Sequence, residues 1–272
     1  MQLGIRLEIH PGDDLSRLAD MIASRGFGAL HAHFPEGCDR SLARRLGRAC
    51  AHHGLSVDAI SGYANPLRPD EAPMGSTFEQ LLDLIDLLPL LDARRIVSWS
   101  GSFGPGLFDE HPDNHGEVGW QALQQSVEDL FPVLDDAEAI LVLDPYYTHV
   151  LSHPNEVARF CAEINSPYVR VMLDPPGMLP PEQWDHQAEL IPLGVRALTP
   201  YVGMIQFRDM RLKHGAFEDA PPGHGVLDYR AFVQAISDSE LSVPMFISHT
   251  PLDQAAAARR FVLDHAHAVQ LR

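Results

Sequence analysis

The chain has 272 residues, of which 45% are hydrophobic and 21% are charged, a composition typical of a folded globular enzyme. The net charge is −17 at pH 7, which argues against binding to nucleic acid or to an anionic membrane surface. Three widely spaced cysteines exclude a disulfide framework and a cysteine-rich zinc site. Because the first residues lack a signal-peptide pattern and no apolar run approaches the ~18 residues of a membrane span, the sequence predicts a cytoplasmic protein.

Short apolar segments and longer amphipathic segments alternate along the whole chain. Eight short segments are predicted to be strands: residues 3–9, 29–34, 56–63, 95–101, 139–145, 169–175, 202–209 and 243–250. Eight segments with apolar residues at helical spacing are predicted to be helices: residues 15–26, 41–54, 76–88, 118–131, 154–164, 181–191, 228–236 and 253–269. The third helix has Ser76 at its start and Glu79 three residues later, which is a capping-box pattern.

This alternation predicts an α/β protein built as a single (β/α)8 barrel, one domain over residues 1–272. An open doubly wound sheet is the alternative, but it requires a glycine-rich phosphate turn after the first strand, where this chain has IHPGDD. No linker rich in proline, glycine or serine divides the chain. Functional groups of such barrels lie at the carboxyl ends of the strands, so the strand ends supply the candidate site residues.

Those strand ends are rich in carboxylate, imidazole and amide groups, which an apolar core does not require. Asp144 and Asp174 end two neighbouring apolar strands, and both side chains would point into the mouth of the barrel. Two carboxylates brought together repel each other unless a cation or a shared proton compensates them. A divalent metal ion would do so, joined by neutral ligands such as Gln206 or an imidazole. Alternatively, each aspartate caps the following helix or pairs with an arginine.

Several short motifs, taken in order along the chain, resemble those of one known family of barrels. The segment SGYANPLRPDE at 61–71 is similar to that family's G-Y-x-N-P-L-x-P-D motif, and LDPPGM from Leu173 is similar to D-P-S-H-L. QFRD at 206–209 resembles H-x-K-D, and PGHGVLDY from Pro222 resembles P-G-x-G-x-I-D-[WF]. SWSGS from Ser98 resembles the family's ending of the fourth strand. By these motifs the chain resembles, over essentially its whole length, the xylose isomerase-like TIM barrels, a superfamily of sugar isomerases and epimerases that also contains endonuclease IV-type enzymes.

The resemblance implies one divalent ion (Mn, Zn, Mg, Co or Ni), which the family generally holds with Glu, Asp, His and Glu. At the matching positions this chain has Asp144, Asp174, Gln206 and either Ser248 or His249. Side chains alternate between the two faces of a strand, so a slip of one residue decides which of the last two points inward. The metal set expected here is therefore Asp144, Asp174, Gln206 and His249, while Gly177 replaces the histidine of D-P-S-H.

Enzymes of this kind move a proton between adjacent carbons through an enediolate, with two acid/base groups on opposite faces of the substrate. The resemblance implies that Asp144 and His249 form this catalytic pair. Barrels of this kind are commonly dimeric, so a homodimer is one expectation. Two alternatives remain. One is a degenerate barrel that binds a carbohydrate-like ligand without turnover. The other is an endonuclease IV-type repair enzyme, which the net charge of −17 and the departures at Gln206 and Gly177 oppose.

Other residues are expected to contact a sugar-like substrate, each with a structural alternative. His31 and His33 share one face of their strand and lie in the mouth or in the polar upper layer of the barrel. Arg208 and Lys213 could hold a phosphate or carboxylate, or they are solvated charges. Trp99 could stack on a sugar ring, or it packs at the rim. The remaining substrate-binding candidates follow the third strand, namely Tyr63 and Asn65.

Overall fold

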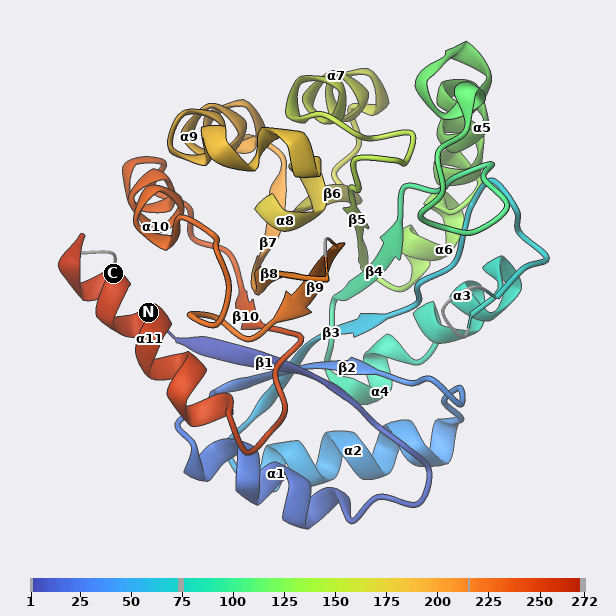
Figure 1. Ribbon diagram of the computed structural model, residues 1–272. Coiled ribbons are helices and arrows are strands. Elements are labelled where there is room, and N and C mark those ends of the chain that lie inside the picture. The colour runs from blue at the N-terminus through green and yellow to red at the C-terminus, as the bar shows by residue number, and fades with distance from the viewer. Residues whose placement is uncertain (1, 73–75, 215, 270–272) are drawn as a thin grey trace.

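The computed structural model describes residues 2–72, 76–214 and 216–269. Eight parallel strands close into a barrel in the order β1-β10-β7-β6-β5-β4-β3-β2, and helices surround it (Figure 1). The barrel strands are β1 (Leu3–Glu8), β2 (Ala29–His33), β3 (Ser56–Ser61), β4 (Arg95–Trp99), β5 (Ile140–Asp144), β6 (Val169–Leu173), β7 (Val202–Phe207) and β10 (Met245–Ile247). Each strand lies within one of the eight predicted segments, so the predicted (β/α)8 barrel is confirmed.

The helices follow the amphipathic segments, and aspartate side chains cap several of them. The helices are α1 (Leu15–Ser24), α2 (Arg40–His52), α3 (Phe78–Ile85), α4 (Leu88–Leu91), α5 (Glu117–Glu128), α6 (Phe131–Asp136), α7 (Pro154–Ile164), α8 (Pro175–Met178), α9 (Gln187–Leu198), α10 (Tyr229–Asp238) and α11 (Ala255–Ala268). Asp14, Asp39 and Asp228 each accept a backbone N–H at a helix start, which satisfies an amide that has no partner within the helix.

Two predicted helices differ from the observed ones in a way that proline explains. The segment 76–88 contains α3 and the start of α4, and the segment 118–131 contains most of α5 and the start of α6. Pro89 and Pro132 stand in the first turn of the second helix of each pair, where a proline is tolerated but cannot continue a preceding helix. The capping box was also predicted one residue too early, because Thr77 and Gln80 form it.

The interior of the barrel and the layer between strands and helices form two apolar clusters. Inside the barrel, one cluster is made of Ala29, Ala59, Tyr63, Val97, Val142, Met172, Met204 and Phe246. The second and larger cluster packs the helices onto the outer face of the strands. The apolar interior closes the barrel below its mouth, so polar groups at the carboxyl ends of the strands line a cavity with a solid floor.

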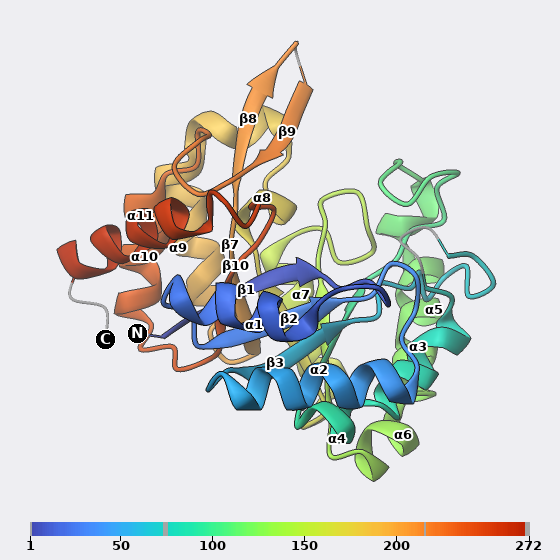
Figure 2. The same ribbon diagram turned by 90° about the horizontal axis from the view of Figure 1, so that it is seen from below.

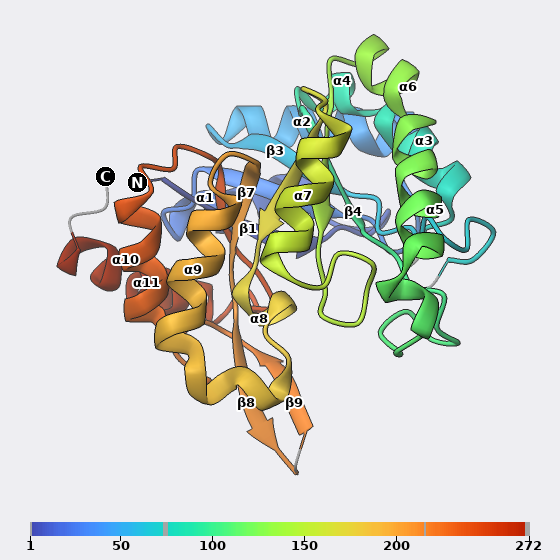
Figure 3. The ribbon, with the colours of Figure 1, turned by 90° about the horizontal axis from the view of Figure 1, so that it is seen from above.

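An antiparallel hairpin that the sequence did not predict follows β7. It consists of β8 (Asp209–Lys213) and β9 (Ala216–Ala220) and stands away from the barrel (Figures 2 and 3). Four backbone N–H groups, of Met210, Gly223, Gly225 and Leu227, donate to the buried carboxyl group of Asp209 and fix the base of the hairpin. The hairpin therefore projects from a rigid base beside the mouth.

None of the helices in the described ranges combines the length and the apolar character that crossing a membrane requires.

Candidate active site

A cavity of about 420 Å³ lies at the carboxyl ends of the strands, where functional sites of such barrels are found. Its lining combines charged, polar and aromatic side chains: Arg6, Tyr63, Trp99, Phe108, Asp144, Tyr146, Asp174, Gln206, Arg208, Met210, Phe217, Glu218, Asp219 and His249. Seven of the eleven residues expected from the sequence are among them: Tyr63, Trp99, Asp144, Asp174, Gln206, Arg208 and His249. A larger cavity of about 750 Å³ lies at the other end of the barrel, where the strands begin.

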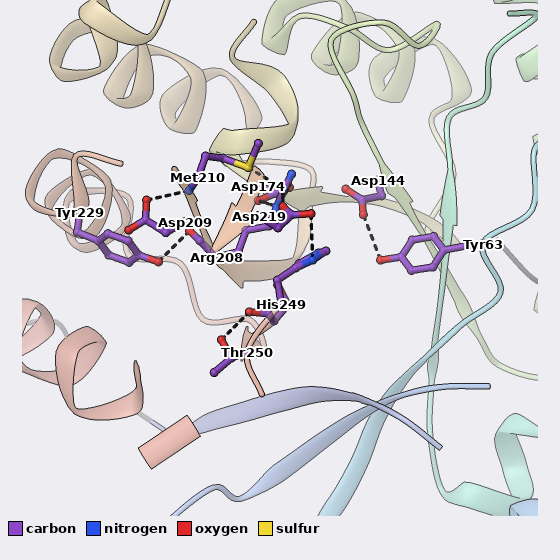
Figure 4. Close-up of polar contacts among 11 residues, drawn as sticks. Tyr63, Asp144, Asp174, Arg208, Asp209, Met210, Asp219, Tyr229, His249 and Thr250 are labelled. Carbon is purple, nitrogen blue, oxygen red and sulfur yellow. Dashed lines mark hydrogen bonds and ion pairs between the residues drawn. The ribbon is translucent and has the colours of Figure 1, made fainter. Parts of the chain in front are cut away.

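An ion-pair network occupies one side of this cavity and is centred on Arg208 (Figure 4). The Nε of Arg208 donates to both carboxylate oxygens of Asp174 at 3.1 and 2.9 Å, and Nη2 donates to Oδ2 at 2.7 Å. Nη1 is paired with Asp219 and lies 3.3 Å from the sulfur of Met210. The Tyr229 hydroxyl donates to the Arg208 backbone carbonyl at 2.9 Å. Both the head and the backbone of Arg208 are therefore held in place.

Burial disfavours the ionised forms of the groups in this network, and the attraction between their opposite charges compensates for that cost. Burial disfavours the charge of Arg208, but the carboxylates of Asp174 and Asp219 outweigh that effect and hold the pKa of the guanidinium above its ordinary value. Burial pushes the pKa of Asp174 upward, and the Arg208 guanidinium opposes that shift. The sequence left three roles open for Asp174: metal ligand, cap of the following helix, or partner of an arginine. The structure contains the pair with an arginine.

His249 reaches the cavity from beyond the end of β10, because its backbone adopts a left-handed conformation with φ of 48°. Its Nδ1 lies 3.2 Å from Oδ2 of Asp219. Burial and the charge of Arg208 lower the pKa of His249 to about 3, although Asp219 opposes this shift. The imidazole is therefore neutral at neutral pH, and its Nδ1 faces the Asp219 carboxylate.

Asp144 lies three strands around the barrel from β10, beyond β7 and β6. Its Oδ2 accepts a hydrogen bond from the Tyr63 hydroxyl at 3.2 Å, while the buried Oδ1 has no partner within the described residues. Burial and the neighbouring Asp174 carboxylate raise the pKa of Asp144 to about 8, against the opposing charge of Arg208. Asp144 therefore retains its proton at neutral pH, which is unusual for a carboxylic acid.

Gln206 and Ser248 are also buried at this end of the barrel, and each has an oxygen without a hydrogen-bond partner in the described residues. Ser248 is two residues beyond Phe246, whose ring belongs to the barrel interior, so alternation directs Ser248 inward as well. Residue 249 nevertheless lines the cavity and residue 248 does not, because the left-handed backbone at His249 interrupts the alternation. The sequence alone could not decide between these two residues.

Four predicted substrate-binding residues lie away from the cavity lining. His31 is fully buried and lies 2.8 Å from the Ser61 hydroxyl, and His33 packs edge-on against Tyr63 with ring centres 5.9 Å apart. Asn65 bonds the backbone of Ser102 through both its amide nitrogen and its oxygen. Lys213 is half exposed on β8 and pairs with Glu218 at 3.2 Å. His31 and His33 share the inward face of β2 with Ala29 and so lie inside the barrel, whereas Asn65 joins the loop after β3 to the loop after β4.

Sequence reasoning missed several of the residues that line the cavity. Arg6 lies within an apolar strand, and the signal that could have revealed it is its inward position between Gly4 and Glu8. No hydrogen bond or ion pair to its guanidinium is found within residues 2–72, 76–214 and 216–269, and its Nε is buried. Asp219 was missed because the hairpin was not predicted. Phe108 and Tyr146 come from the loops after β4 and β5 and pack together at 4.8 Å.

The four expected metal ligands, as they lie, do not fit a divalent ion. Asp144 and Gln206 each have a free buried oxygen, but both oxygens of Asp174 are taken by Arg208 and Nδ1 of His249 faces Asp219. No group of three or more His, Cys, Asp or Glu side chains is arranged for metal binding in the part of the chain that is described. A divalent ion on Asp174 would also stand close to the Arg208 charge, which repels it.

Comparisons with known proteins agree on the architecture. The family model described as xylose isomerase-like TIM barrel matches residues 17–265. An L-ribulose 3-epimerase superposes with a TM-score of 0.74 at 16% identity, over 99% of this chain and 96% of its own. A D-psicose 3-epimerase, determined in the presence of D-fructose, gives 0.72 at 14% identity over 99% of both chains. A xylose isomerase-like TIM barrel protein from Mycobacterium smegmatis, in complex with magnesium, gives 0.66 at 14% identity over 93% and 88%. No curated protein matches the chain.

Proposed function

Because the chain belongs to the xylose isomerase-like TIM barrel family, we propose that it is an isomerase or epimerase of a small sugar-like substrate that works by proton transfer in the barrel mouth. The observation that carries the proposal is the pairing of Asp144 with His249. Both line one cavity from different sides, and their surroundings keep one group protonated and the other unprotonated at neutral pH. Opposed shifts of two titratable groups in one cleft are a mark of an acid/base pair.

The proton path follows from the state of these two groups. Nε2 of His249 would accept the proton from the carbon next to the substrate carbonyl, and the electron pair of that C–H bond would form the double bond of an enediolate. Asp144 would then deliver its proton from the other side. Delivery to the same carbon gives an epimer, whereas delivery to the former carbonyl carbon, with the hydroxyl proton moving between the two oxygens, gives an isomer. A proton on Nδ1, which faces Asp219, would leave Nε2 unprotonated for this step.

The rest of the lining suits a polyhydroxylated ligand. Trp99 and Tyr63 stack with ring centres 4.6 Å apart and offer an aromatic wall. Arg6 and Arg208 supply N–H donors for hydroxyl or carbonyl oxygens. We propose that His31, His33 and Asn65, which do not line the cavity, act as positioning residues, while the hairpin residue Lys213 would reach only a group that extends out of the mouth.

A divalent ion on Asp144, Asp174, Gln206 and His249 stays a prediction for this chain. If Arg208 released Asp174, these four residues could hold it, and a bound ion would polarise the substrate carbonyl. Because the present arrangement does not fit an ion, none of the steps above passes through a metal.

The test is exchange of the carbon-bound proton in deuterated water, followed by NMR over a panel of ketoses, aldoses and their phosphates. We expect exchange with the parent protein and a loss of about 10²- to 10⁴-fold in Asp144→Asn and in His249→Asn, the range that removing a general acid or base produces. Asparagine suits position 249 because it tolerates the left-handed backbone there.

The matched control is His53→Asn, which changes a histidine of the same kind at the C-terminus of α2, before β3 and at the opposite end of the barrel. It should leave exchange at the parental rate. A parent that binds panel sugars but exchanges no proton, with or without added Mn²⁺, would replace the proposal with the binding-protein alternative.

A further inference from the structure

Arg208 lies on one side of the mouth, where its surroundings fix its positive charge and leave one of its N–H groups without a partner among the described residues. A guanidinium has five N–H groups. The Nε–H and one Nη2–H go to Asp174, and the two Nη1–H groups face Asp219 and the sulfur of Met210. One N–H of Nη2 therefore remains without a partner among the described residues, on a side chain that lines the cavity.

The absence of a side chain at Gly177 leaves room for the ion pair between Asp174 and Arg208. A Cβ placed on Gly177 would lie 3.0 Å from Oδ2 of Asp174, 2.9 Å from the carbonyl oxygen of Pro145 and 3.6 Å from Nη2 of Arg208. Any side chain at position 177 would therefore press on the carboxylate that orients the guanidinium. Because Asp174, Asp219 and the Tyr229 hydroxyl hold Arg208 from three directions, its charge requires little rearrangement when a reaction begins.

We propose that the Arg208 guanidinium is a catalytic residue that binds the substrate carbonyl oxygen and stabilises the negative charge of the enediolate, so that proton transfer in this barrel runs without a divalent ion. The inference rests on the proposed function. When the carbon-bound proton moves to His249, the electron pair of the carbonyl π bond moves onto the oxygen, and the N–H of Nη2 meets that charge. Arg208 breaks no bond and transfers no proton in this step. His249 accepts the only proton that leaves the substrate, and Asp144 supplies the only proton that is returned.

Gln206 fits this arrangement better than it fits a metal site. Its neutral amide lines the same cavity as Arg208, and its buried Oε1 has no partner among the described residues. Gln206 therefore offers a polar group beside Arg208 without a negative charge that would compete with the oxyanion for the guanidinium.

The experiment has one readout that depends on turnover and one that does not. The first is exchange of the carbon-bound proton in the presence of EDTA, which should proceed at the parental rate. Arg208→Gln should lower kcat by about 10²- to 10³-fold, the range for removal of one oxyanion donor, with a much smaller change in KM. Arg208→Lys should restore part of the rate, because it returns the charge without the planar fork.

The second readout is calorimetric binding of glycolohydroxamate, an anionic mimic of an enediolate, in EDTA. We expect saturable binding to the parent and a loss of at least about tenfold in Arg208→Gln. Because that variant leaves Asp174 buried and unpaired, the double variant Asp174→Asn, Arg208→Gln replaces both partners by neutral amides and should fold while still failing to bind. The matched control is Arg95→Gln, at the start of β4, where Nε donates to the Gly203 carbonyl at 3.2 Å. It should bind as the parent does.

The two proposals can fail separately. A parent that does not bind the hydroxamate in EDTA, or an Arg208→Gln variant that binds it equally well, overturns the role of Arg208. One divalent ion per chain in protein purified without chelator, combined with exchange that EDTA abolishes, overturns it as well. A different outcome is that no panel sugar exchanges its proton, while the hydroxamate still binds and its binding depends on Arg208. That result refutes the proposed isomerase activity but supports the oxyanion site at Arg208.

Discussion

On the β6–β7–β10 side of the mouth, charged side chains pair with one another, whereas on the β1–β5 side Asp144 and Arg6 have no ion pair among the described residues. Asp174, Arg208 and Asp219 form a network in which both Asp174 oxygens have donors. Across the cavity, Asp144 has a buried oxygen with no partner in the described chain, and the Nε of Arg6 is buried. Paired charges fix geometry, while unpartnered groups remain available to a ligand.

The two aspartates show the difference at nearly identical places in the fold. Asp144 is the last residue of β5 and Asp174 follows the last residue of β6, and both are 2% exposed. A guanidinium within hydrogen-bonding distance of Asp174 favours the ionised carboxylate, whereas the Tyr63 hydroxyl that faces Asp144 carries no charge. Burial then keeps Asp144 protonated. Equivalent positions in a barrel thus acquire opposite electrostatic roles through one neighbouring side chain.

The largest effect expected is on stability, and it separates the two aspartates. Asp174→Asn should lower the free energy of unfolding by about 3–5 kcal/mol, because it leaves the Arg208 charge buried without its main partner. Asp144→Asn should not lower it, because asparagine resembles the protonated carboxyl group that is already present and, unlike aspartate, has no proton to lose when the chain unfolds at pH 7. Urea unfolding of both variants at pH 7 measures the contrast. Equal losses would show that the two sides of the mouth do not differ in this way.

The sequence predicted the barrel because an alternation of strand and helix segments persists over the entire chain. It placed Asp144, Asp174, Gln206 and His249 at one end of the barrel because parallel strands bring their carboxyl ends together. It could not predict the partner of Asp174, since pairing with a metal and pairing with an arginine need the same carboxylate. Nor does any sequence pattern signal the left-handed backbone that brings His249 into the cavity.

The hairpin was missed for a different reason. Two exposed antiparallel strands do not bury a continuous apolar face, so β8 and β9 lack the pattern by which the barrel strands were recognised. Asp219, which lies on β9 and contacts both Arg208 and His249, was therefore invisible as a site residue. Side chains that a peripheral element delivers to a site depend on tertiary contacts, which a single sequence does not display.

A second prediction compares how the contributions of His149 and Asp144 to the free energy of unfolding depend on pH. His149, in the loop after β5, donates from Nε2 to the Leu107 carbonyl, and burial lowers its pKa to about 3 from an ordinary value of 6.5. Its stabilising contribution is complete above pH 6.5 and is lost as the pH falls from 6.5 toward 3, because the unfolded chain binds the proton first. Asp144 acts in the opposite sense, since its pKa rises from 3.8 to about 8 and its contribution is lost as the pH rises through that range.

The measurement is the free energy of unfolding against pH for the parent, His149→Gln and Asp144→Asn. Relative to the parent, His149→Gln should gain stability as the pH falls from 6.5 to 4, and Asp144→Asn should gain stability as the pH rises from 4 to 8. The two difference curves should therefore slope in opposite directions. A flat difference curve for either variant would mean that its group titrates in the same way in the folded and unfolded chains.

The smallest effect concerns the Tyr63 hydroxyl, the one donor that the described residues direct at the carboxyl group of Asp144. Tyr63→Phe removes this hydrogen bond but keeps the ring that stacks on Trp99, so the loss of stability should be about 0.5–1.5 kcal/mol. Tyr168→Phe is the control, because it removes an exposed hydroxyl that pairs with Asp135, and it should leave the unfolding midpoint unchanged. A Tyr63→Phe loss as large as that of Asp174→Asn would show that the Asp144 side is as tightly coupled as the Arg208 network. Its polar groups would then not be the spare donors and acceptors that a substrate could use.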